Sequence, residues 1–143
     1  MFEKILVPID GSPNSYKALQ YAVQIAQQCH SNITLIHVIE RPRYAVYPPE
    51  AHINMDEAFA LIKADGEKLL LQRKGEIEKT GLKVNILQTE GSPAEEILKI
   101  IPDYDLIVMG TRGHSPVKEL LLGSVSTKVV HHASKPVLLI RPN

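Results

Sequence analysis

Glycines and serines after a short apolar run are the residues of this sequence best suited to chemistry. Residues 106–109 are Leu-Ile-Val-Met, and Gly110 and Gly113 follow them. After nine further residues comes a segment of small residues that begins at Gly123. Glycine lets the backbone approach an anion, and hydroxyl and N–H groups donate hydrogen bonds to it. The pattern therefore predicts a phosphate-binding loop.

Two common phosphate-binding loops do not fit this spacing. A P-loop has a lysine and then a serine or threonine after its last glycine, but Gly123 is followed by Ser124 and Val125. The dinucleotide fingerprint places three glycines in one strand-to-helix turn, which the nine-residue gap between Gly113 and Gly123 breaks. The sequence favours a phosphate site of another kind.

Short apolar runs predict the strands that must position this loop. They lie at residues 5–9, 33–38, 83–89, 106–109 and 137–140. The first two runs show little polar alternation, which is typical of a parallel sheet covered on both faces. Residues 83–89 alternate as an edge strand does. The last run, Val137–Ile140, is also assigned to an edge.

Helices are predicted between the strands. Ser12, Asn54 and Ser92 are capping residues at three helix starts, and the last two have a glutamate three positions on, as in a capping box. The first helix is expected to bury the face that includes Tyr16. The second is expected to end near residue 80. A fourth helix is predicted over residues 117–129, where valine or leucine recurs every fourth position.

This alternation predicts an α/β fold: a doubly wound, Rossmann-like, five-stranded parallel sheet of order 3-2-1-4-5, with helices on both faces. The length of 143 residues suits a single domain over residues 1–143. Ligands of doubly wound sheets bind beyond the carboxyl ends of the strands, where the strand order reverses. We therefore expect residues 8–12 and 109–113 to share one crevice.

At these glycines the chain resembles the universal stress protein family, specifically its ATP-binding branch. That branch has glycine, two residues, glycine, nine residues, and then glycine with serine or threonine. Gly110, Gly113, Gly123 and Ser124 meet this pattern. The similarity extends to KILVPIDGS near the start, LIHV in the second strand and HHASKPVLLIR near the end.

The resemblance implies ATP as the ligand and assigns its contacts. The positions implied around adenine and ribose are Pro8, Ile9, Asp10 and Val38. Met109 and Gly110 are implied beside the ribose. The implied phosphate-binding positions are Gly113, Gly123, Ser124, Val125 and Ser126. Because ATP carries four negative charges, we expect Mg²⁺ or Mn²⁺ to bridge its phosphates.

The composition makes other partners and compartments less suitable. Lys plus Arg and Asp plus Glu number 16 each, so no net charge draws the chain to nucleic acid or an anionic membrane. Cys29 is the one cysteine, no apolar stretch is long enough for a membrane span, and the N-terminal apolar run is too short for a signal peptide. We expect a cytoplasmic protein.

The sequence favours an ATP-binding regulatory protein, and the resemblance adds the context of the stress response. Slow ATP hydrolysis is left open, because no residue pattern orients Arg112, His114 or Lys118 for catalysis. The main alternative is a scaffold or interaction dimer of the same fold with no nucleotide. A phosphorylated receiver domain would need paired acidic residues after the first strand, and this sequence does not have them. An enzyme that adenylates a substrate would need a loop richer in glycine and serine than residues 10–13.

Two further expectations concern surfaces. An apolar edge strand at Val137–Ile140 invites antiparallel pairing with a second copy, a homodimer that the resemblance also implies. Residues 41–55 form a long loop in which Tyr44 or Tyr47 could cover a base, although a simple connection is the preferred interpretation.

Overall fold

The computed structural model of the protein describes residues 1–42, 54–113 and 122–142. Its centre is a five-stranded parallel sheet of order β3-β2-β1-β4-β5, which confirms the predicted order. The strands are β1 (Lys4–Pro8), β2 (Asn32–Ile39), β3 (Val84–Glu90), β4 (Leu106–Gly110) and β5 (Val137–Ile140). The central strand β1 pairs with β2 on one side and β4 on the other, so the order reverses there.

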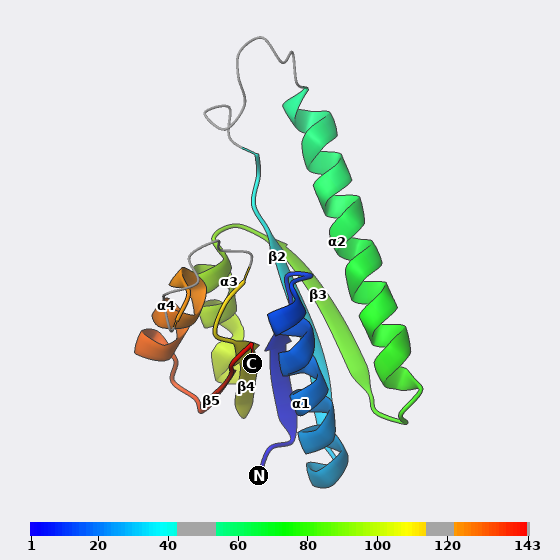
Figure 1. The fold of residues 1–143 in the computed structure, drawn as a ribbon, viewed down its shortest axis with the longest axis vertical. Helices are drawn as coiled ribbons and strands as arrows, with labels where there is room; N and C mark the ends of the chain where they lie inside the picture. The colour runs from blue at the N-terminus through cyan, green and yellow to red at the C-terminus, as the bar shows by residue number, and fades with distance from the viewer. Residues whose placement is uncertain (43–53, 114–121, 143) are drawn as a thin grey trace.

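Helices cover both faces of the sheet (Figure 1). They are α1 (Pro13–Cys29), α2 (Met55–Glu78), α3 (Pro93–Ile100) and α4 (Ser124–His132). Leu19 of α1 and Leu70 of α2 share one core with Val7 of β1, whereas Ile97 of α3 and Val129 of α4 share the other with strand residues that point the opposite way. This alternation is the period-two geometry of strands buried on both faces.

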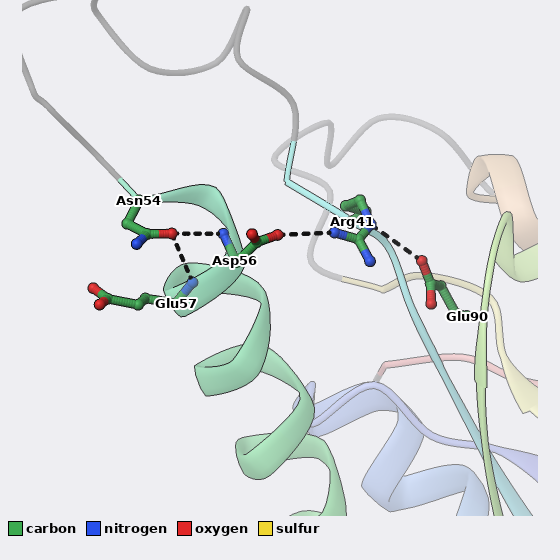
Figure 2. A network of polar contacts seen from close by, with 5 residues as sticks. All are labelled: Arg41, Asn54, Asp56, Glu57 and Glu90. Carbon is green, nitrogen blue, oxygen red and sulfur yellow. Dashed lines mark hydrogen bonds and ion pairs between the residues drawn. The ribbon is translucent and has the colours of Figure 1, made fainter.

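Ser12, Asn54 and Ser92 all lie at the N-caps of helices, as predicted, but only two of the three make a capping hydrogen bond with their side chains. Ser12 caps α1 by accepting a hydrogen bond from the Ser15 N–H at 3.2 Å. Asn54 caps α2 by accepting from the N–H groups of Asp56 and Glu57 (Figure 2). Ser92 lies at the predicted N-cap of α3, but its side chain makes no capping hydrogen bond there, so the predicted capping box is wrong.

The start of α2 is tied to the ends of two strands by Arg41, which follows β2. Its guanidinium lies 3.5 Å from an Asp56 carboxylate oxygen and 3.4 Å from one of Glu90 at the end of β3 (Figure 2). It also stacks 4.3 Å from the centre of the Phe59 ring. The N-terminal part of α2 extends beyond the carboxyl ends of the strands (Figure 1), and Arg41 holds that part beside β3.

Two expectations from the sequence are wrong, one about the buried face of α1 and one about where α4 begins. Tyr16 was expected to be buried on the packed face of α1 but is 38% exposed, and its ring stacks with the guanidinium of Arg73 from α2. The helix predicted over residues 117–129 begins only at Ser124, since Gly123 is extended (ψ 175°). Val117 and Leu121, which suggested the longer helix, lie outside the described residues.

The two edge strands of the sheet are β3 and β5, as expected. In β5, Leu138 is 36% exposed and Ile140 is buried. Within residues 1–42, 54–113 and 122–142, no helix has the length and apolar character needed to cross a membrane.

Candidate functional site

A cleft of about 520 Å³ lies where the carboxyl ends of β1, β2 and β4 meet the starts of α3 and α4. All of the residues that the resemblance assigned to the ligand line this one cleft, although they come from segments far apart in the chain. They are Pro8, Ile9, Asp10, Val38, Met109, Gly110, Gly113, Gly123, Ser124, Val125 and Ser126. The predicted convergence of residues 8–12 and 109–113 is thus found in the structure.

The end of β1 turns sharply at Asp10 and Gly11. Gly11 has φ +82°, a left-handed conformation that favours glycine. Asp10 Oδ1 accepts a hydrogen bond from the Ser12 N–H at 2.9 Å, and the Asp10 N–H donates to Ser15 Oγ at 3.3 Å. These contacts fix the carboxylate of Asp10 at the wall of the cleft, where its other oxygen, Oδ2, faces the loop after β4.

Gly113 is the point where that loop approaches β1. A Cβ atom on Gly113 would lie 2.5 Å from Oδ2 of Asp10, closer than real contacts allow. Any side chain at Gly113 would therefore have to displace the Asp10 carboxylate. Gly113, which the resemblance assigned to phosphate binding, thus also allows the loop after β4 to pack against Asp10 at the end of β1.

Asn14 joins three segments beneath the cleft. Its Nδ2 donates to the Ile140 carbonyl oxygen at 2.9 Å, and its Oδ1 accepts from the Arg112 N–H at 2.8 Å. Asn14 is 6% exposed and lies against Gly110, where an added Cβ would be 2.6 Å from Oδ1. One amide side chain from α1 thus supports the end of β5 and the loop after β4.

The start of α4 is fastened to the same loop through the Thr111 carbonyl oxygen. This oxygen accepts from the Gly123 N–H at 2.6 Å and from the Ser126 hydroxyl at 2.8 Å. The two glycine segments of the motif are therefore brought together by direct hydrogen bonds. This explains how Gly110 and Gly123 can line one site.

The first turn of α4 presents backbone donors to the cleft. The Thr127 N–H makes the first helical bond, to the Gly123 carbonyl oxygen at 3.0 Å. The preceding N–H groups of Ser124, Val125 and Ser126 occupy positions that have no intrahelical acceptor. Gly123 has no side chain to cap them. The positive end of the helix dipole and these donors together suit a phosphate group.

Ser126 differs from the role expected for it. The sequence suggested that its hydroxyl would donate to phosphate, but Ser126 is 2% exposed and its hydroxyl donates to the Thr111 carbonyl oxygen. A hydroxyl has one proton to donate. Ser126 therefore holds the start of α4 in place, and its backbone N–H is the group left for a ligand.

The opposite part of the cleft is apolar. Val38 and Ile36 project from β2 on the face of the sheet covered by α3 and α4, next to Pro8, Met109 and Ile97. Because neighbouring strands lie about 4.8 Å apart, the ends of β2 and β4 are about 10 Å apart, with β1 between them. The cleft thus has an apolar wall at β2 and backbone donors beside β4.

Several lining residues were not found from the sequence. Ile36 and Glu40 could have been inferred from Val38, since residues two apart on a strand share a face. Ser92 had been interpreted only as a helix cap. Nothing in the sequence marked Lys128 as a lining residue, because its position in the cleft depends on where α4 begins. The cleft also contains Ser15, Pro93, Ala94 and Ile97, as well as Arg112, which the sequence had raised as a possible phosphate contact.

Of the described residues, the charged side chains that line the cleft are two acids, Asp10 and Glu40, and two bases, Arg112 and Lys128. Among the described residues, no group of three or more His, Cys, Asp or Glu side chains is arranged to hold a metal ion. His114, Lys118, Tyr44 and Tyr47, which the sequence also raised as contacts, lie outside the described part of the chain.

Comparison with known proteins agrees with this architecture. The model of the universal stress protein family matches residues 1–141. The universal stress protein YxiE of Bacillus subtilis is 38% identical over 150 aligned positions, which cover 99% of this chain and all of that protein. Universal stress protein MJ0577 of Methanocaldococcus jannaschii is 31% identical over 155 positions, covering 99% of this chain and 96% of that protein.

Solved structures show the same fold. Universal stress protein UspA from Lactobacillus plantarum superimposes with a TM-score of 0.85 at 28% identity, with 98% of each chain covered. The MJ0577 structure gives a TM-score of 0.84 at 32% identity, covering 99% of this chain and 96% of that one. Two more distant structures, each 21% identical, have nucleotides bound: AMP in an Arabidopsis thaliana protein and cAMP in another universal stress protein.

Proposed function

The chain belongs to the universal stress protein family, and from that premise we propose that it is an ATP-binding regulatory protein of the stress response. ATP would occupy the cleft at the carboxyl ends of β1, β2 and β4. The observation that carries this proposal is the first turn of α4, whose N–H groups face a cleft lined by Gly110, Gly113 and Gly123.

The dimensions and chemistry of the cleft support a nucleotide. Its volume of about 520 Å³ falls within the range of about 300–1,000 Å³ typical of small-molecule sites. The base would lie against Val38 and Ile36, and the phosphates would lie at α4, about 10 Å away across the end of β1. The Asp10 carboxylate, midway between them, would accept hydrogen bonds from ribose hydroxyls. AMP and cAMP in distant proteins of this fold fit the same class of ligand.

We include a divalent cation in the proposal. Mg²⁺ usually binds through phosphate oxygens, water and one or two carboxylates rather than through a cage of protein ligands. Asp10, whose Oδ2 faces Gly113, offers one carboxylate on the phosphate side of the cleft, which fits that mode of binding. When bound, Mg²⁺ or Mn²⁺ would neutralise part of the phosphate charge, while the α4 N–H groups and Gly113 orient the phosphates.

We further propose a cytoplasmic homodimer. Cys29 is free and exposed, which suits a reducing compartment. The edge strand β5 supplies the pairing surface. The carbonyl oxygens of Pro136 and Ile140 accept hydrogen bonds from β4, so by strand alternation the backbone groups of Val137 and Leu139 point away from the sheet. Antiparallel pairing of two such edges would satisfy these groups and close the assembly.

The proposal is tested by the small molecules that the purified protein holds. The protein is denatured, the released compounds are separated by chromatography, and ATP is then titrated calorimetrically with Mg²⁺ into ligand-free protein. We expect ATP binding that is lost in Gly123→Val. The backbone at Gly123 (φ −74°, ψ 175°) is open to valine, so the loss would come from the side chain. Its Cβ would lie 3.3 Å from the Thr111 carbonyl oxygen, at a position that lines the cleft.

Gly75→Val is the matched control, because a Cβ on Gly75 meets nothing within 4 Å and Gly75 does not line the cleft. It should bind ATP as the unmodified protein does, and urea unfolding should show that both variants are folded. A folded unmodified protein that neither releases nucleotide nor gives a heat of binding would refute the proposal. The alternative, a scaffold dimer of this fold without nucleotide, would then take its place.

A further inference from the structure

Lys128 is a lining residue to which the proposed function assigns no role. It lies on α4, lines the cleft and is exposed. It makes no hydrogen bond or ion pair with any described residue, whereas Lys99 and Arg73 on other helices pair with glutamates. A cation without a partner, on the wall of a cleft suited to anions, is available to a ligand.

The geometry of α4 aims this cation at the donors of the first turn. Lys128 follows Ser124 by four residues, so the two lie on the same face of the helix, about 6 Å apart along its axis. Side chains on a helix lean toward its N-terminus. The Lys128 stem therefore extends back along that face toward the turn formed by Ser124, Val125 and Ser126.

The two kinds of donor differ in reach. The N–H groups of Ser124, Val125 and Ser126 converge within a single helical turn, which is room for one phosphate group. A second or third phosphate of the same ligand must extend away from that turn, into the space that an ammonium on a flexible four-carbon stem can reach. Lysine suits this task, because its point charge needs no fixed approach direction.

We propose that Lys128 sets the preference of the cleft for nucleoside di- and triphosphates over monophosphates, by pairing with the phosphates beyond the one held at α4. This inference rests on the proposed function, since it assumes that the phosphates lie at α4. The inference adds to the proposed function a residue that distinguishes ATP from AMP. The backbone donors of α4 alone cannot do so, because they would bind one phosphate group of either nucleotide alike.

The test compares ATP, ADP and AMP by titration calorimetry with the full-length protein and Lys128→Gln, with and without Mg²⁺. The variant should bind ATP about tenfold more weakly, about 1.4 kcal/mol, and ADP several-fold more weakly, while AMP affinity changes less than twofold. Lys128→Arg should retain most of the ATP affinity, because it keeps the charge. The loss should shrink as salt is raised.

Lys83→Gln is the control with the same change in net charge. Lys83 is exposed and precedes β3, so it lies at the opposite end of the sheet from the cleft. It should leave all three affinities unchanged. If the unmodified protein binds ATP and Lys128→Gln weakens ATP and AMP equally, or neither, the inference is overturned and the proposed function stands. If the unmodified protein binds no nucleotide, both fall.

Discussion

The contact between Gly110 and Asn14 can be tested by a double-mutant cycle. A Cβ on Gly110 would lie 2.6 Å from Asn14 Oδ1 and 2.7 Å from its Cγ. Asn14 cannot simply move away, because its amide is held at 2.9 Å to the Ile140 carbonyl oxygen and at 2.8 Å to the Arg112 N–H. Gly110→Ala should therefore disturb the Asn14 hydrogen bonds as well as the packing.

The size of each effect follows from the groups left unpaired. In Asn14→Ala the Arg112 N–H loses its acceptor, at a cost of about 1–3 kcal/mol. The Ile140 carbonyl oxygen keeps one partner, the Thr111 N–H at 3.0 Å, so its loss is about 1 kcal/mol. We expect a decrease of about 2–4 kcal/mol in the free energy of unfolding. Gly110→Ala should cost a similar amount, since overpacking a core costs about 1–3 kcal/mol.

In the double variant the alanine at position 14 removes the atoms that the new methyl group would meet. The double variant should therefore be about 1–2 kcal/mol more stable than the sum of the two single changes predicts, as for residues in direct contact. Urea unfolding followed by circular dichroism gives the four free energies. Asn85→Ala, at an exposed position on β3, should cost little and serves as the control. Additivity within about 0.5 kcal/mol would refute the proposed contact.

Two further predictions concern α2 and β5. Gly66→Ala should destabilise the protein by about 1–3 kcal/mol, because its Cβ would clash with Gln88 Nε2 and lie 2.7 Å from His37 Cδ2. Gly75→Ala on the same helix meets nothing within 4 Å and should stabilise it by about 0.5–1 kcal/mol, so equal shifts in thermal unfolding midpoint would contradict the packing of α2. Leu138→Lys should convert the proposed dimer to monomers in light scattering, because like charges would face each other across the paired strands, whereas Leu71→Lys, a change at another exposed leucine, should not. A monomeric unmodified protein at micromolar concentration would argue against the dimer.

Much of the fold follows from local signals in the sequence. The continuous apolar runs and the helices between them were enough to predict a parallel sheet covered on both faces. Its order, 3-2-1-4-5, was expected from the doubly wound class of fold and is the order found. The caps at Ser12 and Asn54 were also correct, since they depend only on neighbouring backbone groups. Ser92 shows the limit of such reasoning: a serine can lie at an N-cap while its hydroxyl takes no part in capping.

The cleft was located for a similar reason. Strand ends converge by topology, so the residues after β1 and β4 had to lie together. The roles of individual side chains were less predictable, because they depend on contacts across the fold. Asn14 is an unremarkable polar residue in the first turn of a helix until β5 and the loop after β4 are placed beside it. The period of four from Val117 to Val129 suggested one helix, but the backbone at Gly123 is extended and α4 begins at Ser124.

Asn14 has a consequence for how two parts of the protein communicate. Its single amide is bonded to the end of β5 and to the loop that lines the cleft, so a displacement of either group changes the geometry available to the other. If a second copy pairs with β5, and that pairing alters nucleotide affinity by some factor, thermodynamic linkage requires that nucleotide alter the pairing affinity by the same factor. The protein would then report ATP concentration as a change in its state of association.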